Sequence, residues 1–260
     1  MTSEVLRAIF MVAVSWGLED SSMAGVLFPF AVLIRVAFAA LLRPGEVVNL
    51  LVGDIRLPSA FGSQSAVIAI RSPKTRAVAG RVQFALLRDA GVMSWLSWLL
   101  EGLPRSVRIW PTTMLRVRSV FQQVLARAGL KSLKLTPASL RAGGATTLIA
   151  NDVDIGRVKF LGRWQSERSL ASYIQEAMAQ LTWLDLDTQQ QALIRHLNVA
   201  CSWAWSQPPL VPWTSLFSRR RQWRTLRSQT QHGQRFDPSR PQAGRRGAAP
   251  PWTASRVTMS

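Results

Sequence analysis

The sequence predicts a mainly α-helical fold with a small antiparallel β-sheet. Three observations support this fold class. Long apolar segments, of which residues 24–42 are the most hydrophobic, indicate helices. Two short runs of strand composition, residues 65–71 and 80–86, flank a polar turn and indicate a hairpin. A hydrophobic content of 48% is enough to build a core from most of the chain.

The helices are expected to begin and end at recognisable residues. Gly17 and Gly129 should each end a helix, and Ser166 should cap another. Thr136 and Pro137 suit the N-cap and first position of a helix. Within that helix Gly143 and Gly144 indicate close packing against another backbone. Apart from the helix that begins at Thr136 and Pro137, the expected helices span residues 3–16, 24–42, 87–101, 113–128, 153–161 and 167–180.

Residues 24–42 are apolar nearly all round, and their length approaches the ~20 residues of a membrane span. Arg35 near the middle, Pro29, and the charged turn at residues 43–46 argue against a span. We therefore expect a buried core helix and no membrane partner. A basic, membrane-associated protein is the alternative.

The charge balance limits the classes of partner and of chemistry. Thirty-two basic residues stand against 14 acidic ones, a formal net charge of +18, and 28 of the basic residues are Arg. This balance predicts a polyanionic partner, nucleic acid first and an anionic membrane surface second. One Cys and two His exclude a disulfide framework and a Cys- or His-rich metal site within one chain. Catalysis must then depend on Arg, Lys, carboxylates, hydroxyls or Trp, and no metal is expected.

The composition changes near residue 200. Residues 201–260 hold ten Arg and one acidic residue, together with seven Pro. Such a segment buries too little apolar surface to offset its chain entropy. We predict one folded domain at 1–200 and a basic, Pro/Arg-rich tail at 201–260 that is largely disordered, from about residue 206 on.

Four segments carry residues suited to phosphoryl transfer without a metal. That chemistry needs cations on the non-bridging oxygens, a donor for the leaving oxygen, and an in-line nucleophile. Three of the segments alone also have a structural explanation: an ion-paired helix end, a solvated lysine and a half-buried tyrosine. In chain order the residues are Arg43 with Glu46, Lys74 in the hairpin turn, Arg141 in the first turn of a helix, and Trp164 followed nine positions later by Tyr173, the only tyrosine.

In this order and spacing, the four segments resemble the tyrosine recombinase (phage integrase) family. Five of six catalytic positions match, and the resemblance covers roughly residues 10–180. The spellings Gly162-Arg163-Trp164 and Tyr173-Ile174-Gln175 look like the eukaryotic mobile-element branch. The resemblance implies the catalytic-domain fold of the DNA breaking–rejoining enzymes, in which Glu46 would support Arg43.

The resemblance also implies a mechanism of DNA strand breakage and rejoining, as in site-specific recombination or integration. Arg43 and Arg141 would grip the scissile phosphate, and Trp164 would donate its indole N–H or pack against the site. Tyr173 would form a 3′-phosphotyrosyl link while Lys74 protonates the departing 5′ oxygen. The covalent link would store the energy for rejoining, so neither a cofactor nor a small-molecule substrate is expected.

Two features depart from the family pattern. Ala138 stands where the family has a His that assists proton transfer, and a methyl group cannot do this. Only about twenty residues precede residues 24–42, where family members usually carry a DNA-clamping domain. The chain is therefore expected to be a fragment, a minimal form or a decayed copy. The alternative function is a weakened or inactive DNA-binding remnant.

The expected partner is double-stranded DNA, with self-association of the protein on it. The basic tail would add non-specific affinity through counterion release, or would be a solvated segment without a role. Its arginine clusters favour a nuclear location if the source is eukaryotic, and the cytoplasm otherwise. The tail residues concerned are Arg219, Arg220, Arg221, Arg224 and Arg227.

Overall fold

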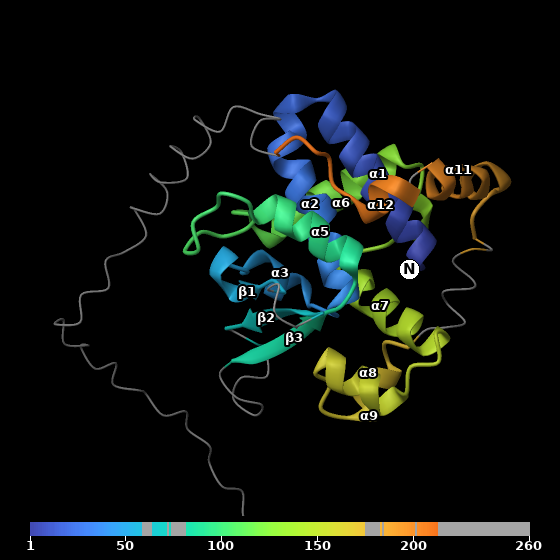
Figure 1. Ribbon diagram of the computed structural model, residues 1–260. Coiled ribbons are helices and arrows are strands. Elements are labelled where there is room, and N and C mark those ends of the chain that lie inside the picture. The colour runs from blue at the N-terminus through green and yellow to red at the C-terminus, as the bar shows by residue number, and fades with distance from the viewer. Residues whose placement is uncertain are drawn as a thin grey trace, which may run out of the picture. The chain divides into compact units, whose positions relative to one another are not determined.

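The computed structural model describes residues 1–58, 64–71, 73, 82–174, 183, 185–200 and 202–212 (Figure 1). Helices form most of this part of the chain, and the strands lie together beside α3. The helices are α1 (Ser3–Glu19), α2 (Ser21–Ala39), α3 (Pro44–Val48), α5 (Ala90–Leu100), α6 (Met114–Arg127), α7 (Ala138–Ala150), α8 (Ile155–Gly162), α9 (Glu167–Ala171), α11 (Thr188–Ala200) and α12 (Ser202–Ser206). Two short 3-10 turns are η1 (Val52–Asp54) and η2 (Lys131–Leu133).

The sheet has three antiparallel strands in the order β1 (Ile55–Arg56), β2 (Ala66–Ile70) and β3 (Gln83–Leu87). Ile68 lies opposite Ala85 in the β2–β3 pair, which confirms the predicted hairpin. The turn of this hairpin, including Lys74, lies outside the described residues. β1 was not predicted, because two residues are too few to show an alternating pattern.

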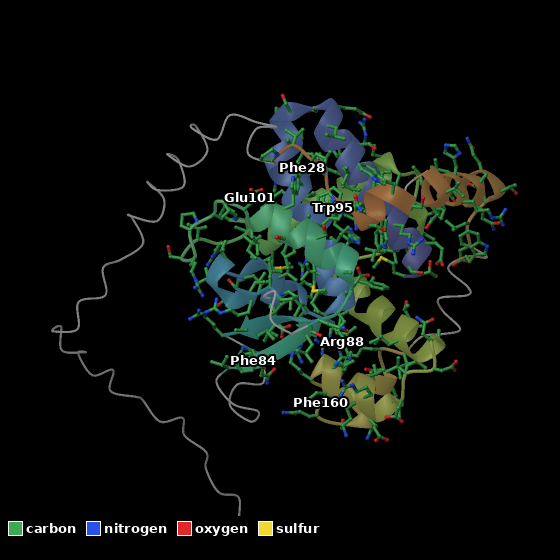
Figure 2. The ribbon with its side chains drawn as sticks, in the orientation of Figure 1. Phe28, Phe84, Arg88, Trp95, Glu101 and Phe160 are labelled. Carbon is green, nitrogen blue, oxygen red and sulfur yellow. The ribbon has the colours of Figure 1, made fainter. Side chains whose placement is uncertain are left out.

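The apolar helix α2 lies at the centre of the helical core. It packs against α1, α5, α6 and α7, and 67% of its most apolar window is buried. By length and composition it is the one described helix that could cross a membrane, with a mean hydropathy of 1.9. Its burial among other helices is the environment expected for a core helix. Phe28 of α2 and Trp95 of α5 point into this core, whereas Phe84 and Phe160 lie exposed at the edge (Figure 2).

Several helix ends differ from those that the sequence predicted. α1 runs past Gly17 to Glu19, because Asp20 ends it and begins α2, its carboxylate accepting from the Ser22 N–H. α7 begins at Ala138, and Thr136 does not cap it; the Thr136 N–H donates to the Ser139 hydroxyl instead. Gly129 has a φ of +67° after the end of α6, as a helix-ending glycine should.

The segment after α11 packs onto the helical core, although the sequence assigned it to the tail. The indole N–H of Trp95 donates to the Ala204 carbonyl at 2.8 Å, and that of Trp98 to the Val211 carbonyl at 3.0 Å. The ring of Trp205 covers the guanidinium of Arg35 at 3.7 Å. Residues 213–260, which include all the tail arginines, lie outside the described part.

Arg35 explains why this segment is held in place. Its side chain is 1% exposed, and none of its three nitrogens has a hydrogen-bond partner among the described residues. Burial lowers the pKa of Arg35 to about 10, although the negative charge of Asp89 acts to raise this pKa. The faces of Phe10 and Trp205 also compensate for the buried cation, since an aromatic ring attracts a cation over its face.

We expect Trp205→Ala to lower the free energy of unfolding by about 2 kcal/mol, the value of a desolvated cation–π contact. Urea denaturation measures this change. Trp203→Ala is the matched control, because Trp203 lies on the same short helix but is 62% exposed. Equal losses in the two variants would show that Trp205 does not anchor the segment through Arg35.

Candidate functional site

Arg43 is fixed against Glu46 at the start of α3. Its backbone N–H donates to Glu46 Oε2 at 2.8 Å, and its guanidinium donates to Oε1 at 2.9 Å. The Glu46 side chain is buried, while that of Arg43 is partly exposed. The local ion pair that the sequence suggested is therefore present, and it leaves part of the Arg43 guanidinium open to solvent.

Arg141 lies in the first turn of α7 and reaches back to two backbone carbonyls. Its Nη1 donates to the Leu41 carbonyl at 2.6 Å and its Nη2 to the Gly162 carbonyl at 2.5 Å. Its guanidinium lies 4.1 Å from the centre of the Trp164 ring, and only 2% of the residue is exposed. Arg141 thus connects α7 to the chain just before Arg43 and to the end of α8.

Two backbone features make this reach possible. A Cβ on Gly144 would lie 2.2 Å from the Phe38 carbonyl oxygen, so the predicted close approach of α7 to another backbone is confirmed. Leu41 has a φ of +51°, a conformation that costs roughly 1–3 kcal/mol for a residue other than glycine. In this conformation its carbonyl accepts hydrogen bonds from both Arg141 and Arg163.

Arg163 is a member of the site that the sequence reasoning missed. It follows α8 with a φ of +59° and ψ of +39°, the left-handed conformation in which glycine usually ends a helix. Its Nη2 donates to Glu46 Oε2 at 2.8 Å and to the Leu41 carbonyl at 3.3 Å. The one sequence signal was an arginine between Gly162 and Trp164, where only the tryptophan was given a role.

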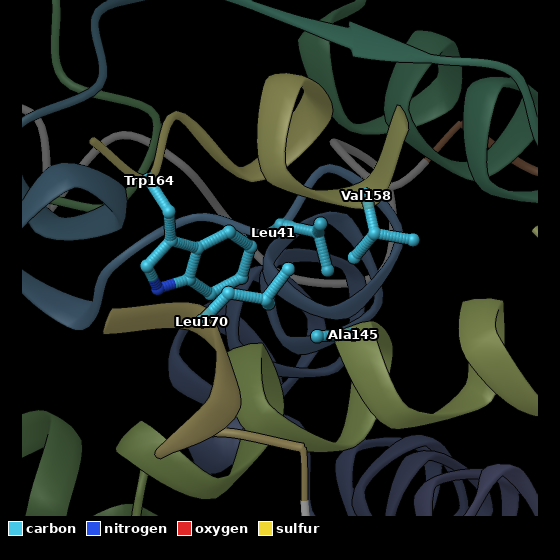
Figure 3. Packing of buried hydrophobic residues seen from close by; sticks show 5 residues of the cluster. All are labelled: Leu41, Ala145, Val158, Trp164 and Leu170. Atoms are coloured by element: carbon cyan, nitrogen blue, oxygen red, sulfur yellow. The ribbon is translucent and has the colours of Figure 1, made fainter. Parts of the chain in front are cut away.

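Trp164 and Tyr173 pack against each other, with ring centroids 5.5 Å apart. Trp164 belongs to a small apolar cluster with Leu41 and Leu170 (Figure 3). The half-buried Tyr173 also packs against this cluster. Ser166 caps α9 as predicted, but the helix ends at Ala171 instead of continuing. Tyr173 therefore lies just after a helix, held by its N–H to the Leu170 carbonyl at 2.7 Å.

Gly162 sets the position of the Trp164 ring. A Cβ at residue 162 would lie 1.5 Å from a ring carbon of Trp164, so the ring cannot stay in place beside any other residue type. We expect Gly162→Ala to displace the ring and to lower the free energy of unfolding by about 1–3 kcal/mol, as overpacking does. Thermal and urea unfolding measure this effect. Gly156→Ala, on the exposed face of the same helix, should remain within about 1 kcal/mol of wild type.

The site carries more positive than negative charge. Among the described residues, Arg43, Arg141 and Arg163 lie around the carboxylate of Glu46, which leaves two positive charges in excess. Desolvation, with repulsion from Arg43 and Arg163, lowers the pKa of Arg141 to about 9. Desolvation also lowers the pKa of Arg163, although the carboxylate opposes this.

Buried guanidinium groups also retain unused donors. The Nε of Arg141 and the Nε and Nη1 of Arg163 have no hydrogen-bond partner among the described residues. A buried N–H donor without an acceptor is costly, and a bound anion would relieve both the charge excess and the missing hydrogen bonds. The arrangement is therefore suited to holding an anion such as a phosphodiester.

The remaining predicted residues are not all brought to this site. Ala138 is exposed in the first turn of α7, three positions before Arg141, and offers only a methyl group there. Lys74 and the tail arginines fall outside the described residues. Within the described ranges, no three His, Cys, Asp or Glu side chains gather as metal ligands would.

No protein-family model and no curated protein matches the sequence. Several solved structures are similar, among them three structures of recombinases. XerA recombinase aligns with 16% identity and a TM-score of 0.49 over 78% of this chain and 65% of that chain. XerH site-specific recombinase bound to difH substrate in a pre-cleavage complex aligns with 17% identity and a TM-score of 0.52 over 70% of this chain and 51% of that chain. XerH in a post-cleavage complex with palindromic difH substrate aligns with the same identity and TM-score, over 78% of this chain and 53% of that chain.

The chain spans about half to two thirds of the length of these recombinase chains. At such low identity the XerH comparisons show a shared fold, which in this chain consists of the helical core with its three-stranded antiparallel sheet. The expected fold class is confirmed: this chain has the tyrosine recombinase catalytic-domain fold.

Proposed function

We propose that this chain breaks and rejoins DNA strands through a covalent 3′-phosphotyrosyl intermediate. The observation that carries the proposal is the gathering of three arginines around Glu46, beside Trp164 and Tyr173. Excess positive charge in a desolvated site stabilises an anion far more than it would in water. A phosphodiester is the anion that a guanidinium fork matches in geometry. The fold shared with site-specific recombinases supports this class of reaction.

In the proposed reaction, Arg43 and Arg141 hold the non-bridging oxygens of the scissile phosphate, and Trp164 donates its indole N–H or packs against the site. Tyr173 Oη forms a bond to phosphorus as the P–O5′ bond breaks. Lys74 supplies a proton to O5′, and the phenolic proton leaves to water. Attack by the 5′-hydroxyl of another strand reverses these steps and rejoins the DNA, so the chemistry requires no nucleotide.

The proposed partner is double-stranded DNA, on which copies of the chain associate. The XerH structures were solved with a DNA substrate, which supports DNA as the ligand of this fold. We also propose membership of the eukaryotic mobile-element branch, on the Gly162-Arg163-Trp164 spelling, and with it a nuclear location. The arginine-rich tail would add affinity by counterion release, which a weaker salt dependence after removal of residues 213–260 would test.

A second function, a DNA-binding remnant without the reaction, is favoured by two observations. Ala138 offers no group for proton transfer. Arg141 already donates to two backbone carbonyls and is almost fully buried, so fewer of its donors are free for a phosphate. DNA affinity does not require proton transfer, so binding would survive where cleavage does not.

A covalent trapping assay separates the two functions. The probe is a pool of duplexes with random sequence, each nicked so that rejoining is blocked. A protein–DNA adduct that survives denaturation supports the enzyme. Tight binding of the same duplexes without an adduct supports the remnant.

A further inference from the structure

The carboxylate of Glu46 is shared between two arginines that come from distant parts of the chain. Oε1 accepts from the guanidinium of Arg43, whereas Oε2 accepts from both the Arg43 backbone N–H and Arg163 Nη2. Glu46 and Arg163 are 117 positions apart, and the Arg163 side chain is only 8% exposed. The ion pair therefore joins the segment of Arg43 to the segment that leads into Trp164 and Tyr173.

The left-handed backbone conformation of Arg163 indicates that its side chain makes contacts that offset the strain. Glycine adopts the left-handed conformation after a helix without strain, whereas arginine does not. Beneath that strained backbone, Nε and Nη1 are buried without hydrogen-bond partners among the described residues. A glycine would relieve both unfavourable features at once. The protein keeps an arginine here, and its favourable contacts are those to Glu46 and Leu41.

We propose that Arg163 is a positioning residue that fixes the distance between the phosphate-gripping Arg43 and the nucleophile Tyr173. It acts through the Glu46 carboxylate, and it does not touch the reacting atoms. The Leu41 carbonyl adds a second tie, because it accepts from both Arg163 and Arg141. The nucleophile segment is thereby tied to both predicted phosphate ligands. This inference depends on the proposed function for its effect on rate, but not for its effect on geometry.

The rate test is a double-mutant cycle in the trapping assay. We expect Arg163→Gly to slow adduct formation by about 10²-fold without loss of thermal stability, since a misplacement of about 1 Å has such an effect. In a Glu46→Gln background the same change should slow the reaction by less than about threefold, because residues that act through one contact are not additive. Arg157→Ala, which removes an exposed cation from α8, the helix that precedes Arg163, is the control.

A second readout does not require cleavage. Tyr173 is the only tyrosine, so 3-fluorotyrosine labelling of the full chain gives a single ¹⁹F resonance. Arg163→Gly and Glu46→Gln should each shift or broaden this resonance, and the double variant should match the single ones. Arg157→Ala should leave it unchanged.

The rate and the ¹⁹F resonance distinguish failure of the positioning role from failure of the proposed reaction. Independent, multiplicative rate losses, or a ¹⁹F resonance unaffected by Arg163→Gly, would overturn the positioning role. A chain that forms no adduct, but whose ¹⁹F resonance shows the coupled response, would retain the positioning role and lose the proposed reaction.

Discussion

Tyr173→Phe should abolish the covalent protein–DNA adduct and leave DNA binding unchanged. The substitution removes one oxygen from a ring that packs on Trp164, so the packing survives while the proposed nucleophile is lost. No other tyrosine exists in the chain to replace it. The trapping assay with nicked duplexes measures the adduct, and a gel-shift titration of the same duplexes measures the affinity.

Peptide mapping of the wild-type adduct provides the stronger check. The DNA should be attached to the peptide that contains Tyr173. Attachment to a serine, a threonine or Cys201 would assign the nucleophile to another residue, whatever the Phe variant does. Unfolding curves of wild type and Tyr173→Phe should coincide within about 0.5 kcal/mol, since the half-buried ring keeps its packing against Trp164.

The parts of the fold that sequence reasoning reached are those with strong local patterns. Residues 24–42 are so uniformly apolar that a buried helix was the expected outcome, and α2 occupies the core. The hairpin was predicted because β2 is rich in β-branched residues and a polar turn separates it from a second run of strand composition. The helix ends were less predictable. Gly17 resembled a stop, but Asp20 ends α1 because its side chain caps the next helix.

The packing of the segment after α11 onto the helical core could not be predicted from its composition. Residues 202–212 share the Pro-rich character of the tail that follows, and this character favours disorder. The buried Arg35 requires a cover, however, and Trp205 supplies it. That relation joins two positions 170 residues apart, and no local pattern contains it.

The same limit applies within the site. Arg43, Arg141, Trp164 and Tyr173 were selected by order and spacing, and the structure brings all four together. Arg163 was missed because its importance depends on a left-handed backbone and on a carboxylate far away in sequence. Spacing rules identify the groups that are proposed to do the chemistry. They do not identify the groups that hold them, because those act through tertiary contacts.

Ala138→His should raise the rate of adduct formation by about 10²–10⁴-fold, the usual contribution of a general acid or base. Ala138 is exposed and lies three positions before Arg141, so an imidazole there fits without repacking and shares a helix face with the arginine. The rate should also acquire an inflection near pH 6.5, which the wild type lacks. Single-turnover trapping between pH 5 and 8 measures both effects.

Asn151→His places an imidazole at the other, exposed end of the same helix and is the matched control. It should change neither the rate nor its pH dependence. If the wild type already forms an adduct at a measurable rate and Ala138→His raises that rate, the wild-type chain is a slow enzyme. An adduct that appears only in the variant identifies an intact site that lacks its proton-transfer group. Should neither protein react on duplexes that both bind, the three arginines hold DNA phosphate without cleaving it, and the remnant function is the correct one.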